Sequence, residues 1–175
     1  MTFNTTSLPL ARAIRDKELL VREPLRPLAP SSSRHVLVIP EIDALLDGHL
    51  AFGNFPAPEA DRLIASFVAG WLVTASRKIT KRKPDVEQIV GEDEVWALCP
   101  RRPPPGWRIL GRFFDPGVFI GLRAFDKHWL ARNYKTGSAL VIEDWKEIFG
   151  DKEPYRAQSI DLYVTGLVRD VDETE

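Results

Sequence analysis

Basic side chains and side chains that can transfer a proton gather between residues 108 and 134 of the chain. The set comprises Arg108, Arg112, Arg123, Lys127, His128, Arg132 and Tyr134. Arginine and lysine bind phosphate oxygens, and histidine or tyrosine can move a proton. Arg108 and Arg112 are an even number of residues apart, so they project from the same face of a strand. The set indicates either a phosphate-binding site or a solvated sheet face whose basic residues pair with nearby carboxylates.

A second basic cluster comes immediately before an acidic stretch. It comprises Arg77, Lys78, Lys81, Arg82 and Lys83, and five carboxylates follow it between Asp85 and Glu94. Clustered lysines and arginines can hold the phosphate backbone of a nucleic acid. The formal net charge of the chain is −1 at pH 7, which excludes a protein that attracts nucleic acid over its whole surface. The sequence therefore predicts only a local basic patch at residues 77–83.

The sequence lacks the patterns of several other kinds of chemistry. Its three histidines are scattered and have no cysteine beside them, so we expect no metal site. It has neither a glycine-rich phosphate loop nor a nucleophile elbow, and we expect no cofactor. Cys99 ends an apolar run, which favours an inert half-buried thiol over a nucleophile. A single cysteine cannot form an intramolecular disulfide, so we expect a protein of the reducing cytoplasm.

The elements that would position these residues follow from the apolar pattern. Residues 35–39 form a β-branched run that predicts a strand, and residues 58–79 have apolar side chains every three or four positions, which predicts one long helix. From residue 95 the period changes to two, which predicts strands over 95–99, 107–114 and 118–125. The expected fold class is α+β, with an antiparallel three- to four-stranded sheet packed on one long helix and several short helices.

The rest of the chain is expected to frame this domain. Residues 1–34 are predicted to be an N-terminal extension that ends in a proline- and serine-rich linker, either a partner-docking arm or a loose terminus. Residues 35–170 are predicted to form a single α+β domain. The start of the chain lacks the features of a signal peptide, and its most apolar stretch, Leu63–Ala75, is too short to cross a bilayer. We therefore expect no membrane contact.

Two short helices are expected after the predicted sheet. Asp126 is predicted to cap the first, which Gly137 would end, and Gly150 is predicted to end the second. Residues 160–168 fit either a helix or a strand.

Three motifs in the strand region resemble the RelE/HigB superfamily of bacterial toxins, which belong to toxin–antitoxin systems. They are Val95-Trp-Ala-Leu-Cys-Pro-Arg101, Gly106-Trp-Arg-Ile-Leu110 and Phe119-Ile-Gly-Leu-Arg-Ala-Phe-Asp-Lys127. The predicted order of one strand, two helices and an antiparallel meander resembles the same superfamily. The resemblance is mainly carried by residues 95–127.

The resemblance implies an endoribonuclease in which an RNA 2′-hydroxyl attacks the neighbouring phosphate. Arg108, with Arg112 beside it, would stabilise the charge that develops on the phosphate, and Lys127 or His128 would serve as base or acid. The basic cluster at residues 77–83 would hold the RNA backbone. The implied protein partner is an antitoxin.

The sequence leaves two functions open. One is a non-enzymatic protein-binding module, for which Trp107, Trp129 and Trp145 would be interface residues if they are exposed. The other is the RelE-like endoribonuclease, for which the partner is RNA. Neither interpretation involves a membrane, and neither specifies an oligomeric state.

Overall fold

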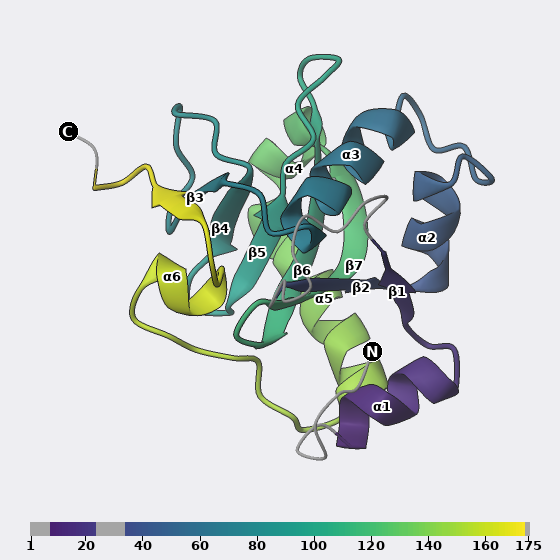
Figure 1. The fold of residues 1–175 in the computed structure, drawn as a ribbon. Coiled ribbons are helices and arrows are strands. Elements are labelled where there is room, and N and C mark those ends of the chain that lie inside the picture. The colour runs from purple at the N-terminus through teal and green to yellow at the C-terminus, as the bar shows by residue number, and fades with distance from the viewer. Residues whose placement is uncertain (1–7, 24–33, 174–175) are drawn as a thin grey trace.

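The computed structural model describes residues 8–23 and 34–173. The strands of this part are β1 (Leu20–Arg22), β2 (His35–Val38), β3 (Val73–Ser76), β4 (Val86–Val90), β5 (Val95–Leu98), β6 (Trp107–Asp115), β7 (Val118–Asp126) and β8 (Val168–Asp170). Its helices are α1 (Leu8–Arg15), α2 (Pro40–Leu46), α3 (Ala57–Val68), α4 (Lys127–Arg132), α5 (Tyr134–Phe149) and α6 (Ile160–Tyr163). Figure 1 shows the strands side by side in one twisted sheet that passes between α3 and α5.

The described strands form a single eight-stranded mixed sheet in the order β1-β2-β7-β6-β5-β4-β3-β8. The expected three- to four-stranded antiparallel sheet is therefore wrong, although the antiparallel meander β5-β6-β7 at its centre is confirmed. The sheet is larger because β4, β3 and β8 extend one side of the meander, while β2 and β1 extend the other. It is mixed because β2 pairs in parallel with β7, and β3 pairs in parallel with both β4 and β8.

The long helix predicted over residues 58–79 is wrong beyond Val68. The chain turns at Gly70, where φ is +83°, and then enters strand β3. A positive φ of this size is open to glycine at little cost, so Gly70 favours a break in the helix. Trp71, Leu72 and Ile79, which the predicted helix would have buried, are all exposed. The longest described helix is instead α5, with 16 residues.

Helices cover both faces of the sheet, which gives three layers. One hydrophobic core lies between the sheet and the buried faces of α2, α3 and α6, and the other lies between the sheet and α1, α4 and α5. Alternate residues of a strand point to opposite faces, so Val36 and Val38 enter the first core while Leu37 enters the second. Both faces of the inner strands β2, β5 and β6 are largely buried, which suits their nearly continuous apolar sequences.

The N-terminal segment contributes to both the sheet and the core. Leu10, Ala13 and Leu19 are buried in the second core, and β1 pairs with β2. Arg22 of β1 donates hydrogen bonds to carboxylates that follow β2 in the sequence, including Asp43 at 2.7 Å. The domain boundary expected after residue 34 thus separates β1 from the strand with which it pairs. The predicted proline- and serine-rich linker, residues 24–33, lies outside the described residues.

The segments after the meander agree with the sequence only in part. Asp126 caps α4 as predicted, because its Oδ1 accepts hydrogen bonds from the backbone N–H groups of His128 and Trp129. Gly137 does not end a helix but lies inside α5, whereas Gly150, with φ of +61°, ends α5 as predicted. Within residues 8–23 and 34–173, no helix has the length and apolar character that crossing a bilayer requires.

Candidate functional site

Arg108 forms a buried ion pair and does not face solvent. Its Nε lies 2.6 Å from Oε1 of Glu87 on β4, and both side chains are 3% exposed. Its Nη1 also donates to the backbone oxygen of Trp107. Since this pair occupies the guanidinium, Arg108 is positioned to stabilise the packing of β4, β5 and β6 rather than to bind a phosphate from solution.

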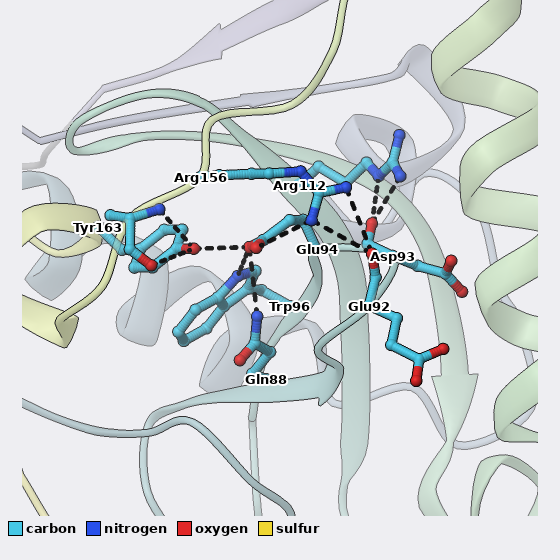
Figure 2. A network of polar contacts seen from close by, with 9 residues as sticks. Gln88, Glu92, Asp93, Glu94, Trp96, Arg112, Arg156 and Tyr163 are labelled. Carbon is cyan, nitrogen blue, oxygen red and sulfur yellow. Dashed lines mark hydrogen bonds and ion pairs between the residues drawn. The ribbon is translucent and has the colours of Figure 1, made fainter.

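Arg112 is also buried, at the other end of β6. Its Nε and Nη2 donate to the backbone oxygen of Asp93 over 3.0 and 2.5 Å, and its guanidinium lies 5.6 Å from the ring centre of Trp145. Burial lowers the pKa of Arg112 below its usual value. Figure 2 shows how it reaches the turn that joins β4 and β5. Arg112 therefore stabilises this turn. Like Arg108, its guanidinium is already hydrogen-bonded within the protein.

A polar network lies next to Arg112 and ties the same turn to the C-terminal segment (Figure 2). The buried carboxylate of Glu94 accepts a 2.8 Å hydrogen bond from the Tyr163 hydroxyl and weaker ones from Gln88 and Trp96. Burial raises the pKa of Tyr163 to about 12. Because the members of this network bind one another, we assign it to stability and not to catalysis.

The basic cluster at residues 77–83 is divided between two environments. Arg77 and Lys78 lie against Asp172, which accepts a hydrogen bond from the backbone N–H of Arg77 at 2.8 Å. Arg82 donates to the backbone oxygen of Val171. Lys81 is exposed, and Lys83 points to a separate concave surface. The cluster is therefore no continuous basic patch, since acidic and carbonyl groups of the C-terminal segment occupy part of it.

Lys83 lines a small cavity of 270 Å³ that we call the basic hollow. Its lining residues are Lys83, Arg101, Pro104, Pro105, Lys127, His128 and Ala131. They come from the β3–β4 loop, the β5–β6 connection and helix α4. None of these lining residues is acidic, and in the described part of the chain no carboxylate forms an ion pair with the side chain of Lys83, Lys127 or His128.

Arg101 is the most confined cation of the basic hollow. Its Nη2 donates to the backbone oxygen of Pro84, while its Nε is buried and has no hydrogen-bond partner among the described residues. Burial lowers the pKa of Arg101, and the nearby charge of Arg108 lowers it further. A buried donor without a partner is costly, and the guanidinium adds its positive charge to those of the two lysines that line the hollow.

A cavity of 500 Å³, which we call the aromatic hollow, lies beside the basic one. It is lined by Phe52, Gly53, Asn54, Trp107, Phe125, Asp126 and Trp129. The rings of Phe125 and Trp129 stack with centres 4.8 Å apart and planes inclined by 18°. Trp107 is held by an edge-on contact with Phe52 and by a 3.0 Å hydrogen bond from its Nε1 to Oδ1 of Asn54. This arrangement fixes the aromatic lining of the hollow, of which the Trp129 ring is exposed to solvent.

The two hollows share the same two chain segments. In the first segment, Pro105 lines the basic hollow and Trp107 lines the aromatic hollow. In the second segment, Lys127 lines the basic hollow and Trp129 lines the aromatic hollow. The backbone N–H of Lys127 donates to the oxygen of Gly106 at 3.1 Å, which holds the two segments together. Gly106 has φ of +83°, and a Cβ there would lie 2.7 Å from the backbone oxygen of Pro100. Only glycine fits this junction without a shift of the backbone.

A cavity of 520 Å³ between α2, β7 and α5 differs from the basic hollow in having several acidic lining residues. It is lined by Glu18, Ile39, Pro40, Glu41, Ile42, Leu45, Leu50, Phe52, Leu122, Arg123, Ala124, Asp144, Glu147 and Ile148. Arg123, which belongs to the predicted phosphate-binding set, forms a two-bond ion pair with Asp144 over 2.5 and 2.6 Å. Its charge is compensated, and the remaining carboxylates disfavour phosphate here.

The structure thus brings together only part of the residues predicted from the sequence. Lys83, Lys127 and His128 line one hollow, while Arg108 and Arg112 are buried with partners of their own. Arg101 and the aromatic hollow were not predicted from the sequence. A signal for Arg101 existed in the sequence, since the prolines at 103–105 and Gly106 mark a fixed loop beside it.

The tryptophans proposed as interface residues fall into two groups. Trp107 and Trp145 are buried, so they cannot dock a protein partner directly. Trp129 is 41% exposed and lies in the aromatic hollow. Of these three tryptophans, only Trp129 is therefore exposed enough to contact a protein partner.

No family model, curated protein or solved structure matches this chain. The RelE/HigB resemblance accordingly rests on the short motifs and on the predicted order of the elements.

Proposed function

We propose that this protein binds single-stranded nucleic acid and places a backbone phosphate in the basic hollow. RNA is the form that the RelE/HigB resemblance implies. The observation that carries the proposal is the convergence of Lys83, Arg101, Lys127 and His128 on one cavity that has no acidic lining residue in the described part of the chain. Such a binding function fits a cytoplasmic protein.

The four side chains supply complementary ways to hold a phosphate. Arginine presents several N–H donors in a fixed plane, and Arg101 is the arginine among the lining residues of the hollow. Lysine is a compact charge on a flexible stem, so Lys83 and Lys127 can follow the anion from opposite chain segments. Because the chain as a whole is near neutral, binding would depend on this site and not on the overall charge.

Cleavage of the bound RNA by 2′-hydroxyl attack is a second proposal. It is favoured by the presence of Lys127 and His128 in the same hollow, where they could act as base and acid. Arg108 has no part in it, because its guanidinium is buried against Glu87. If the proposal is correct, His128→Ala should abolish cleavage of a bound RNA while binding persists. The proposal is wrong if the wild-type protein binds RNA but leaves it intact.

Fluorescence anisotropy with a labelled oligouridylate of about 12 nucleotides tests the binding proposal. Lys127→Ala should weaken binding about fivefold, as expected for about 1 kcal/mol, and should reduce the salt dependence by roughly 0.7 in log–log slope. Lys146→Ala is the matched control, since Lys146 is an exposed lysine on α5 and does not line the hollow. Its affinity should equal that of the wild type.

Two results would contradict the binding proposal. One is the absence of wild-type binding at low salt. The other is an equal loss of affinity in the Lys127→Ala and Lys146→Ala proteins, because that would show a diffuse charge effect and no defined phosphate site.

A further inference from the structure

We infer that the aromatic hollow is the base subsite of the same nucleic-acid site: one unpaired base stacks on Trp129 while the adjoining phosphate occupies the basic hollow. The inference rests on the proposed function and adds the part of the ligand that is recognised besides its charge. It concerns a different set of side chains, so it can fail independently.

The first support is an exposed aromatic surface on a fixed base. Trp129 is 41% exposed, and its inner side is occupied by the stacked ring of Phe125. The backbone N–H of Trp129 donates to the capping carboxylate of Asp126 at 3.1 Å, which holds the start of α4 in place. A base that stacks on such a ring gains contact without first ordering the protein.

The second support is the polar content of the aromatic hollow. Asn54 uses its Oδ1 to accept from Trp107, which leaves the side-chain amide nitrogen without a partner among the described residues. Asp126 uses Oδ1 for both capping bonds, and its Oδ2 has no partner in the same part of the chain. One donor and one acceptor beside an aromatic wall match the edge of a nucleobase, which carries both kinds of group.

The third support is the division of charge and size between the hollows. The carboxylate of Asp126 disfavours a phosphate in the aromatic hollow, whereas the lining of the basic hollow has basic side chains and no acidic one. The aromatic hollow is also the larger, at 500 Å³ against 270 Å³. A base with its sugar therefore fits the first and a phosphate fits the second, and the bond between Lys127 and Gly106 keeps the two sites adjacent.

The test compares two ligands and two tryptophan variants by anisotropy. The ligands are the labelled oligouridylate and an oligomer of equal length that has sugars and phosphates but no bases. Trp129→Ala should bind the oligouridylate about tenfold more weakly than the wild type, as expected when one stacked base is lost. It should bind the abasic oligomer as well as the wild type does, because the basic hollow is unchanged.

Trp71→Ala is the matched control. Trp71 is 50% exposed on the α3–β3 connection and lines neither hollow. Its removal should alter the affinity for neither ligand. Trp129→Phe provides a second check, since a phenylalanine ring also stacks and should recover most of the lost affinity. Equal melting temperatures of the variants would show that each one folds.

The outcomes separate this inference from the proposed function. If Trp129→Ala binds the oligouridylate like the wild type while Lys127→Ala is weakened, the base subsite is wrong and phosphate binding stands. The inference is also wrong if Trp129→Ala loses affinity for the abasic oligomer to the same extent. If the wild type binds neither ligand at low salt, the proposed function fails and the base subsite fails with it.

Discussion

Replacement of Arg108 by alanine should destabilise the protein strongly, because it leaves a carboxylate buried without its counter-charge. The side chains of Arg108 and Glu87 are each 3% exposed. They form an ion pair in the protein interior, with 2.6 Å between Nε of Arg108 and Oε1 of Glu87. The resemblance to RelE/HigB toxins would instead make Arg108 a phosphate-binding residue whose loss spares stability. The variant therefore distinguishes a structural arginine from a catalytic one.

The expected size of the effect follows from the burial of the pair. Removal of one partner of a buried ion pair costs about 3–5 kcal/mol. For a domain of 175 residues, each kcal/mol corresponds to about 2–4 °C, so the melting temperature should fall by about 6–20 °C.

Thermal and urea unfolding followed by circular dichroism measure this effect. The double variant Arg108→Met with Glu87→Leu should recover most of the lost stability, because apolar side chains can replace a buried pair. Arg123→Ala is the control for an ordinary ion pair: Arg123 is 39% exposed beside Asp144, and its loss should cost about 1 kcal/mol or less. An Arg108→Ala protein that melts with the wild type at pH 7 but loses RNA binding would refute the structural role.

Three further outcomes follow from buried groups of the fold. Gly111→Ala should prevent folding, since its Cβ would lie 1.8 Å from the backbone oxygen of Ile120; Gly121→Ala, whose Cβ would meet only side chains at 3.1 and 3.2 Å, should remain soluble with a lower melting temperature. The pKa of Tyr163 is raised in the folded protein to about 12, so its contribution to stability should be complete below the unfolded tyrosine pKa of about 10 and should disappear as the pH rises towards 12. In pH-dependent unfolding, the stability of Tyr163→Phe should not fall in this way. Native Cys99 should resist a thiol reagent that modifies it in denaturant, because burial raises the pKa of its thiol, and rapid native labelling would contradict this.

The meander was predictable because its strands obey a local rule. Residues 95–98, 107–115 and 118–126 alternate between two buried faces, and the sequence shows the corresponding period of two. The strand β4 was missed for the opposite reason. Glu87 and Gln88 made it look like part of an acidic surface stretch, yet both are buried, since Arg108 and Glu94 on other segments satisfy them. Such compensation depends on distant residues, which a local pattern does not contain.

The limits of the predicted long helix have a similar cause. The apolar spacing of residues 57–68 correctly indicates α3, and the same spacing continues through Trp71 and Leu72 although these side chains are exposed. What ends the helix is Gly70 together with the pairing of β3 to β4 and β8, and that pairing is decided outside the segment. For the candidate site, sequence spacing placed Lys127 and His128 together but could not bring Lys83 and Arg101 to them.

Strand β8 follows every other described strand in the sequence, and this affects the order in which the sheet can be completed during translation. Among the described elements, α6 and β8 emerge from the ribosome after all the others, yet Tyr163 packs against Trp96 in the core and β8 covers the outer edge of β3. Until those residues emerge, the nascent chain presents an open strand edge, which can pair with strands of other chains. A polypeptide that stalls before residue 160 would thus carry most of the sheet but would tend to aggregate.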